Sequence, residues 1–296
     1  MAQYDFSTQK KLFNIANKIL IDYDIQDWSF GGGTALSALY YQHRISYDID
    51  IFSDDYSAIN RLFENREEIA ENLGIVMEYV EASSTAITFI LNAENTGLKL
   101  DFVFSPALTA EPYEIKNVFG YPDIKVQTPM EIIAKKMAYR EKATIRDFVD
   151  YALAEKQDQL LTKLKSESIE NIDIDRYLDI VDKFNNFDTT VFNDELENLL
   201  PNEKITKEDL SPIINNVMKP NEYIEIALDS TGEVVAFDEF IESYRSIYEE
   251  IGTYFVYTIK SKGKSYKEVL KLSTEVVLEL IKEEGTNILL LPSLTK

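Results

Sequence analysis

The stretch GGGTALSALYYQHRISYDIDIF, residues 31–52, decides how the rest of the chain is organised. Its glycines predict a turn, residues 34–41 predict one short helix, and the segment that follows predicts a strand carrying Asp48 and Asp50. Side chains alternate between the two faces of a strand, so residues two apart point the same way. We therefore expect the two carboxylates to lie side by side.

Two neighbouring carboxylates repel each other unless a cation lies between them. Oxygen ligands favour a hard cation such as Mg²⁺, which keeps waters or substrate phosphates in its remaining positions. The preceding glycines allow backbone N–H groups and a helix N-terminus to face an anion. A phosphate site beside a metal site is the arrangement that handles a nucleoside triphosphate.

The ordered string that begins at the glycines resembles the AbiEii/AbiGii toxin family of nucleotidyltransferases, relatives of the polymerase-β-type transferases. The resemblance rests on Gly-Gly-Thr-Ala-Leu at 32–36 followed by His43, Arg44, Ser46, Asp48 and Asp50. It covers about residues 28–155. It implies a bacterial, cytoplasmic toxin of type IV toxin–antitoxin, abortive phage infection systems, countered by a separately encoded antitoxin.

Composition limits the chemistry that the chain can perform. With 296 residues it can bury a sizeable core, and its length favours two domains. It has no cysteine, which excludes disulfides, thiol catalysis and thiolate metal sites, and its single histidine, His43, cannot form a histidine cluster. Any metal must therefore be held by oxygen. No apolar run reaches ~18 residues and no secretory pattern opens the chain, so neither a membrane span nor a signal peptide is expected.

The formal net charge of −22 disfavours general binding to a nucleic acid backbone. It suits a basic protein partner, and plain solubility is the simpler reading. One locally basic groove is a candidate, formed by Lys135, Lys136, Arg140, Lys142 and Arg146.

Hydrophobic periodicity and turn residues predict an α+β fold. The expected elements are a helix over 7–23 with Ser7 as N-cap, a strand at 28–30, a helix over 58–73 ending at Gly74, strands at 75–81, 86–92 and 98–104, a hairpin turn at 95–97, an edge strand at 124–127, and helices over 128–140 and 144–155.

The predicted architecture is an N-terminal nucleotidyltransferase domain, residues 1–127, with a mixed twisted sheet flanked by helices. A mostly helical C-terminal domain, residues 128–296, follows and contributes nucleotide-binding residues from its first helices. Residues 157–218 and 237–283 are expected to be mostly helical, with a hairpin within 223–236. The many Tyr and Phe residues of this half are expected in its core.

Asp101 lies within an apolar strand, where a lone carboxylate needs a partner or a ligand. The resemblance implies a third carboxylate on a neighbouring strand that completes the metal site, and Asp101 is the matching position. Lys136 and Arg140 are four residues apart, so they share a helix face and can neutralise phosphates. The family's second motif, a lysine followed four residues later by threonine or arginine, matches them.

Arg146-Asp147 resembles the end of the family's last motif, although Ala143 replaces its leading basic residue. Asp150 is expected to cap or pair within its helix. His43 is expected to be structural, and Arg44 either clamps Ser46 and the strand or contacts phosphate.

Together these expectations describe an Mg²⁺-dependent nucleotidyltransferase that moves NMP from an NTP to an RNA (such as tRNA) or protein acceptor and releases pyrophosphate. The predicted metal ligands, for two Mg²⁺ ions, are Asp48, Asp50 and Asp101. The predicted catalytic set adds Lys136 and Asp147. The predicted nucleotide-binding residues are Gly32, Gly33, Thr34, Lys136, Arg140 and Arg146. Two alternatives are a small-molecule transferase of the antibiotic-resistance type and a non-catalytic, partner-binding module of the same fold.

Overall fold

The computed structural model describes residues 4–92, 98–140, 142–164, 169, 172, 174–199 and 205–217, followed by strands at 223–228, 234–235, 255–260 and 288–290. The chain divides into two compact units. One holds Met1–Ile172 and Lys183–Val217, and the other holds Asp173–Asp182 and Met218–Lys296. The predicted domain boundary at 127/128 coincides with the end of a strand and stays a prediction.

The first unit is built on a seven-stranded mixed sheet with the strand order β3-β4-β5-β2-β1-β7-β6. The strands are β1 (Ser29–Gly31), β2 (Ile49–Ser53), β3 (Val80–Ala82), β4 (Ala86–Asn92), β5 (Leu98–Phe104), β6 (Tyr113–Val118) and β7 (Tyr121–Gln127). Two pairs, β2 with β5 and β1 with β7, are parallel, and the other neighbours are antiparallel.

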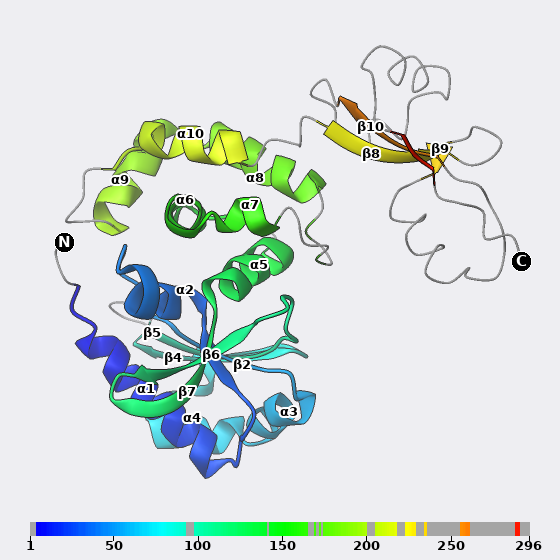
Figure 1. The fold of residues 1–296 in the computed structure, drawn as a ribbon. Coiled ribbons are helices and arrows are strands. Elements are labelled where there is room, and N and C mark those ends of the chain that lie inside the picture. The colour runs from blue at the N-terminus through cyan, green and yellow to red at the C-terminus, as the bar shows by residue number, and fades with distance from the viewer. Residues whose placement is uncertain are drawn as a thin grey trace, which may run out of the picture. The chain divides into compact units, whose positions relative to one another are not determined.

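Helices cover both faces of this sheet (Figure 1). On one face lie α1 (Ser7–Asp22), α3 (Tyr56–Glu64) and α4 (Arg66–Leu73); on the other lie α2 (Gly32–Ala35), which continues as a π-helix (Leu36–Tyr41), and α5 (Pro129–Tyr139). The later helices are α6 (Ile145–Asp158), α7 (Leu160–Leu164), α8 (Ile174–Asn186), α9 (Thr189–Leu199) and α10 (Lys207–Val217).

The alternation of side chains along β2 and β5 positions the polar residues of the sheet. Ile49 and Ile51 on β2, like Leu100 and Phe102 on β5, are buried. The intervening residues, Asp50 and Asp101, therefore project from the opposite face. Burial of the aliphatic and aromatic side chains stabilises this register, because a slip by one residue would expose all of them.

Aromatic packing joins the helices of the first unit. The ring of Phe148 on α6 lies 5.2 Å from Phe184, 5.9 Å from Phe187 and 6.1 Å from Phe192, measured between centroids. The prediction that aromatic side chains of this region belong to the core is confirmed for Phe148, Phe184 and Phe192, whereas Phe187 is half-buried. Their contacts hold α6, and the residues it carries, in place.

The α+β class is confirmed, and most elements lie where the pattern predicts them. Thr128 caps α5 as expected, with its hydroxyl accepting from the Glu131 N–H at 3.3 Å. Several boundaries were predicted wrongly. The predicted N-cap Ser7 is the first residue of α1, and Asp5 accepts a hydrogen bond from its N–H. The helix predicted over 58–73 is broken at Asn65, Asp48 precedes β2, and residues 77–79 form a 3₁₀ turn before β3. The strand predicted at the edge, β7, is internal because β6, which was not predicted, pairs with its outer side.

The second unit contains a four-stranded sheet with the order β11-β10-β8-β9. Its strands are β8 (Tyr223–Leu228), β9 (Val234–Val235), β10 (Phe255–Lys260) and β11 (Ile288–Leu290). Antiparallel pairing of β8 with β9 confirms the predicted hairpin. The helical prediction is wrong at β10, whose sequence FVYTIK is rich in aromatic and β-branched residues that favour strands. The rest of 237–283 and the predicted turn at 95–97 lie outside the described residues.

None of the described helices is long and apolar enough to cross a membrane.

Candidate active site

Asp50 on β2 and Asp101 on β5 are register partners in the parallel pair of strands. Burial and the negative charges of Asp101 and Asp48 raise the pKa of Asp50 to about 7. Burial and the charge of Asp48 also raise the pKa of Asp101, although a hydrogen bond from the Thr88 hydroxyl to Asp101 Oδ1 acts in the opposite direction. The three carboxylates therefore share one electrostatic environment.

The atoms that these carboxylates offer are suitable ligands for a divalent cation. They offer only oxygen, and no described residue makes a hydrogen bond or ion pair with the side chain of Asp50, whose repulsion from its neighbours a cation would relieve. Within the described ranges, however, no three acidic or histidine side chains converge closely enough to surround an ion as they lie. Asp50 and Asp101 are held by paired strands and Asp48 precedes β2, so a site with all three ligands would need these side chains to draw closer together.

The glycine turn lies directly against charged side chains. Gly32 has a φ of +68°, and a Cβ atom there would lie 2.0 Å from Asp50 Oδ2. A Cβ atom on Gly33 would lie 2.5 Å from Nη2 of Arg44. Only glycine fits at these two positions, because the carboxylate and the guanidinium occupy the space that a side chain would need.

The helix predicted after the turn is present, but it starts earlier, at Gly32, and widens into a π-helix at Leu36. Thr34, a predicted phosphate contact, is fully buried. Its hydroxyl has no hydrogen-bond partner among the described residues. In this conformation neither the side chain nor the backbone of Thr34 is accessible to a phosphate, so its predicted contact stays a prediction.

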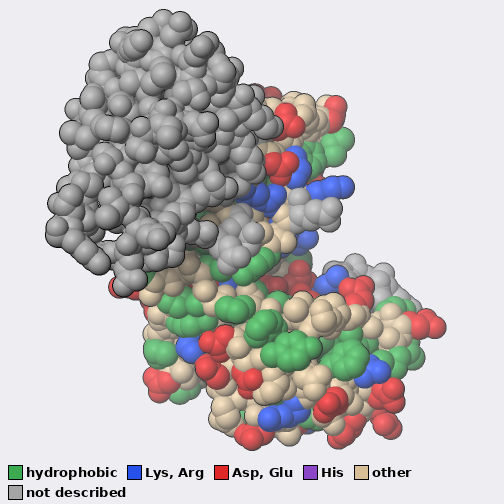
Figure 2. Space-filling model, turned by 90° about the vertical axis from the view of Figure 1, so that its right-hand side faces the viewer, with side chains coloured by type: hydrophobic (Ala, Val, Ile, Leu, Met, Phe, Trp, Pro, Cys, Tyr) green, Lys and Arg blue, Asp and Glu red, His purple; other side chains and the backbone are tan. Residues whose placement is uncertain are grey.

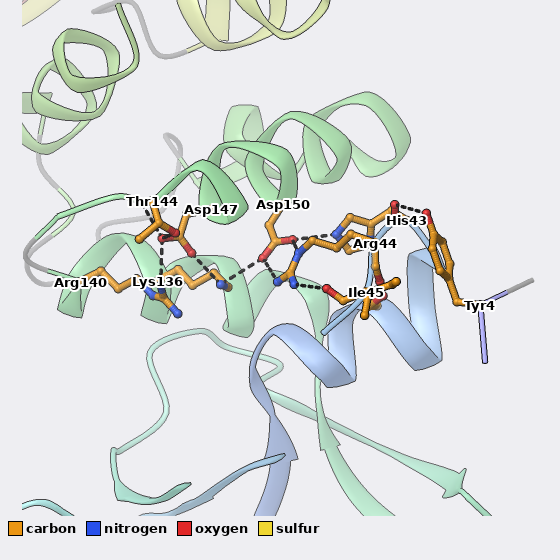
Figure 3. A network of polar contacts seen from close by, with 10 residues as sticks. Tyr4, His43, Arg44, Ile45, Lys136, Arg140, Thr144, Asp147 and Asp150 are labelled. Atoms are coloured by element: carbon orange, nitrogen blue, oxygen red, sulfur yellow. Dashed lines mark hydrogen bonds and ion pairs between the residues drawn. The ribbon is translucent and has the colours of Figure 1, made fainter. Parts of the chain in front are cut away.

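A buried network of charges joins the segment after the π-helix to α5 and α6 (Figure 3). Oδ1 of Asp150 accepts from Arg44 Nε at 2.7 Å and lies 2.7 Å from His43 Nε2. Oδ2 accepts from Arg44 Nη2 at 2.9 Å and lies 3.0 Å from Lys136 Nζ. Burial alone would raise the pKa of Asp150, but the charges of Arg44 and Lys136 outweigh it and hold that pKa well below its usual range.

The prediction that Asp150 pairs within its own helix is wrong, because its partners come from two other segments. His43 has the structural role that was expected, and burial lowers its pKa. The Arg44 side chain hydrogen-bonds Asp150 and the carbonyl of Ile45 rather than Ser46, and its contact with phosphate stays a prediction.

Asp147 closes the other end of the network. Its carboxylate accepts from Lys136 Nζ at 2.8 Å and from Arg140 Nη1 at 3.0 Å, and it caps α6 through Thr144. Although burial opposes ionisation, these cations lower the pKa of Asp147. Arg146, the remaining predicted nucleotide-binding residue, is exposed. Burial raises the pKa of Asp48, and the positive charge of Arg146 offsets part of that rise.

A cavity of about 520 Å³ lies beside these groups. Five of the residues predicted to bind nucleotide or metal line it: Gly32, Gly33, Asp50, Lys136 and Arg140. The remaining lining residues are Phe52, Thr85, Val103, Phe104, Ser105, Pro106, Gln127, Ile132, Lys135 and Tyr139. Asp48, Asp101, Thr34, Arg146 and Asp147 do not line the cavity.

Sequence analysis missed Ser105 and Gln127, two polar residues in the cavity wall. Ser105 directly follows β5, the strand that carries Asp101, and Gln127 is the last residue of β7, which pairs with β1. A polar residue at the end of a strand was the available signal. The basic groove predicted from five residues is wrong in part, since Lys135 and Lys136 are buried and paired with carboxylates. On the face drawn in Figure 2, Lys and Arg side chains lie over both the upper and the lower part of the molecule, interspersed with Asp and Glu.

Comparison with curated proteins gave no match. Among solved structures, JHP933 from Helicobacter pylori is 14% identical with a TM-score of 0.41, over 83% of this chain and 100% of its own. MenT4, a nucleotidyltransferase toxin from Mycobacterium tuberculosis, is 19% identical with a TM-score of 0.32, over 60% and 64%. The antibiotic-resistance factor ANT(2'')-Ia is 19% identical with a TM-score of 0.38, over 55% and 94%.

The model of the family described as nucleotidyl transferase AbiEii toxin, type IV toxin–antitoxin system, matches residues 20–243. This match spans most of the chain and includes the glycine turn, both central carboxylates and the charge network. The chain therefore belongs to the AbiEii nucleotidyltransferase toxins.

Proposed function

We propose that the cavity binds an NTP together with Mg²⁺, and that the protein transfers NMP to a hydroxyl of an RNA or protein acceptor. The observation that carries this proposal is the meeting of three features in one place. Asp50, whose register partner is Asp101, lines the same cavity as the glycine turn and the cations Lys136 and Arg140.

Asp50 and Asp101 are the proposed metal ligands that the sheet holds in place, and Asp48 is the third. When bound, two Mg²⁺ ions would neutralise the carboxylates and the triphosphate and polarise the reacting oxygens. The raised pKa of Asp50 supports this assignment, because burial and the two neighbouring carboxylates outweigh the positive charges of Lys136 and Arg140. Removing that repulsion is a favourable contribution to ion binding.

The phosphates are proposed to lie between the glycine turn and α5. Backbone N–H groups of the glycine turn, at Gly32 and Gly33, would bind phosphate oxygens from one side, and Thr34, which is fully buried, would join them only after this turn opens. Lys136 and Arg140 would bind them from the other, and Asp147 and Asp150 fix the direction of Lys136. Arg146, exposed near Asp48, is the proposed outer contact.

In the proposed reaction the acceptor oxygen attacks the α-phosphorus of the NTP and forms a new P–O bond. The bond from the α-phosphorus to the bridging oxygen breaks, and pyrophosphate leaves with both electrons. Lys136 and Arg140 would stabilise the charge that develops on pyrophosphate. Asp101 would take the proton of the acceptor hydroxyl.

The acceptor, the antitoxin and the cellular location stay predictions. RNA, including tRNA, and protein are the proposed acceptors, a cognate antitoxin is the proposed partner, and the cytoplasm is the expected location. Family membership makes nucleotidyl transfer the activity to measure, and it disfavours the non-catalytic alternative.

The decisive experiment incubates purified protein and Mg²⁺ with each α-labelled NTP and, separately, total RNA, total protein and a small-molecule extract. We expect label in the RNA or protein fraction, lost about 10²-fold or more in Asp50→Asn and Asp101→Asn. The matched control is Asp55→Asn, the same change in an exposed cap of α3. Label confined to small molecules would favour the antibiotic-type alternative. Labelling that needs neither Mg²⁺ nor the two aspartates would contradict the proposed site.

A further inference from the structure

Two buried polar atoms in the cavity wall have no hydrogen-bond partner among the described residues. They are the hydroxyl of Ser105 and Oε1 of Gln127. The two side chains are only 6% and 0% exposed, and both line the cavity. Burying a polar atom without a partner costs free energy, so an unpaired atom beside a cavity points to a ligand that pairs with it.

These two residues belong to one continuous wall that starts at the glycine turn. A Cβ atom on Gly31 would lie 2.3 Å from Gln127 Oε1 and 2.8 Å from the ring of Phe52. Lys135 Nζ lies 4.7 Å from the centre of the same ring and donates to the carbonyl of Ser105 at 3.0 Å. The wall therefore runs from the proposed phosphate site through Gln127 and Phe52 to Ser105.

Outside this wall and the proposed phosphate and metal sites, most of the other side chains that line the cavity are apolar. They are Val103, Phe104, Pro106, Ile132 and Tyr139, and Thr85 is the polar exception. Apolar and aromatic walls with a few fixed polar groups are typical of sites for flat heteroaromatic ligands. A nucleobase has this chemistry, with two π faces and an edge of donors and acceptors.

Lys135 is committed to the protein, so it does not supply the missing contacts. Besides the Ser105 carbonyl, its ammonium group pairs with Glu131 Oε1 at 3.3 Å. The amide nitrogen of Gln127 lies 3.5 Å from the Ser29 hydroxyl, at the limit of a hydrogen bond. The carboxamide oxygen of Gln127 is thus the acceptor available to a ligand.

We propose that Ser105 and Gln127 determine which nucleobase the enzyme accepts. Oε1 of Gln127 accepts from an N–H on the edge of the base, and the Ser105 hydroxyl bonds a second edge atom. Phe52 lies along a face of the base. This inference rests on the proposed function, since it assigns the base end of the nucleoside triphosphate whose phosphates lie between the glycine turn and Lys136.

The test separates base recognition from phosphate binding by using inorganic tripolyphosphate beside the four NTPs. Dissociation constants with Mg²⁺ are measured by calorimetry for the full chain and for Gln127→Met and Ser105→Ala. Gln9→Met is the matched control, because Gln9 is also buried with an unpaired Oε1 but lies on α1, outside the cavity lining. Ser53→Ala removes a neighbouring buried hydroxyl that is hydrogen-bonded to the Asp27 carbonyl.

We expect the ratio of affinities between the best and worst NTP to fall about tenfold in each cavity variant, the effect of one lost buried hydrogen bond. Tripolyphosphate affinity should stay within about twofold of wild type. Gln127→Met should lower the melting temperature little, because it removes an unpaired acceptor and only a long, 3.5 Å contact of the amide nitrogen with Ser29. The two controls should keep the wild-type NTP ratio.

The inference is overturned if wild type binds the four NTPs equally, if neither cavity variant changes the ratio, or if tripolyphosphate binding falls in parallel with NTP binding. A wild-type protein that binds tripolyphosphate and NTPs, with an unchanged ratio in both variants, overturns this inference while leaving the proposed function intact. A wild-type protein that binds neither ligand overturns both.

Discussion

Asp50 and Asp101 lie opposite each other on two parallel strands, and their mutual repulsion is part of the folded state. The buried residues beside them, Ile51 and Phe102, fix the strands in this register. Hydrophobic burial thus holds together two like charges that would separate in solution. The site is assembled at a cost to stability that a bound cation can offset.

The first prediction concerns Asp50→Asn in metal-free protein. The pKa of Asp50 is about 7 in the folded protein, against 3.8 for an aspartate free in water, so wild-type stability should fall as pH rises from about 4 to 7 and then level off. Asparagine cannot ionise, so the variant should be more stable than wild type by up to about 4 kcal/mol at pH 8. Urea unfolding in EDTA measures the difference.

Addition of Mg²⁺ supplies the control. The ion should raise the melting temperature of wild type at pH 8 and leave that of Asp50→Asn nearly unchanged. A variant that is less stable than wild type at pH 8 without metal would contradict the repulsion between the two carboxylates.

The second prediction compares Gly32→Ala with Gly74→Ala. Both glycines have a φ near +70°, so alanine costs about 1 kcal/mol of backbone strain at either position. At Gly32 the new Cβ also meets Asp50 Oδ2 at 2.0 Å, whereas nothing lies within 4 Å at Gly74. Gly32→Ala should lower the transfer rate about 10²-fold by displacing the carboxylate. Gly74→Ala should lose stability alone, and equal activity in the two variants would count against this explanation.

Sequence patterns predicted the parts of the site that depend on local spacing. The glycine turn, the strand that carries Asp50 and the helix that carries Lys136 each follow from short-range periodicity. Asp101 drew attention as a lone acid in an apolar strand, and the family resemblance implied that its strand lies beside the one carrying Asp50. The pairing of β2 with β5 confirms that the strands are neighbours, although the full set of metal ligands stays a prediction.

The missed features depend on contacts between distant segments. Asp150 pairs with His43 across 107 positions, and no spacing along its helix indicates that partner. Ser105 and Gln127 resemble ordinary polar residues at strand ends until the sheet brings them to one cavity. The strand β6, sequence YEIKNV, mixes charged and apolar residues, and its pairing with β7 is what makes it a strand.

The third prediction concerns Asp150→Asn at acid pH. The pKa of Asp150 is far below its usual range, so its contribution is present above pH about 4 and is lost as pH falls through the folded pKa. Removing the carboxylate leaves Arg44 without its partner and should cost about 3–5 kcal/mol at pH 7. The difference in free energy of unfolding between wild type and variant should become smaller as the pH is lowered below about 4, and urea unfolding from pH 7 to 3 measures it.

The matched control lies on the same helix. Asp158→Asn removes a carboxylate whose partner is the hydroxyl of Tyr41, at 2.6 Å, and should cost no more than about 1 kcal/mol. If the loss of unfolding free energy in Asp150→Asn instead grows as the pH falls, the wild-type Asp150 carboxylate is not held in the charged form.

The fourth prediction concerns Thr88, the antiparallel register partner of Asp101. Its hydroxyl donates to Asp101 and so favours the charged form of that carboxylate. Thr88→Val keeps the shape of the side chain and removes the donor, so the pKa of Asp101 should rise further. The acid limb of the pH–rate profile should move to higher pH. Mg²⁺ affinity should fall about 10–100-fold, the usual effect of losing a hydrogen bond that orients a metal ligand.

Thr162→Val is the control, because Thr162 also donates to a carboxylate, Glu155 Oε1, at 2.7 Å, but outside the cavity. It should leave both the Mg²⁺ dependence and the pH profile in place. Thr88→Val with an unshifted acid limb and wild-type Mg²⁺ affinity would mean that Asp101 neither binds the ion nor takes the acceptor proton. Asp50 would then be left without its ligand partner, so this one conservative change tests the role of the carboxylate pair without altering its charge.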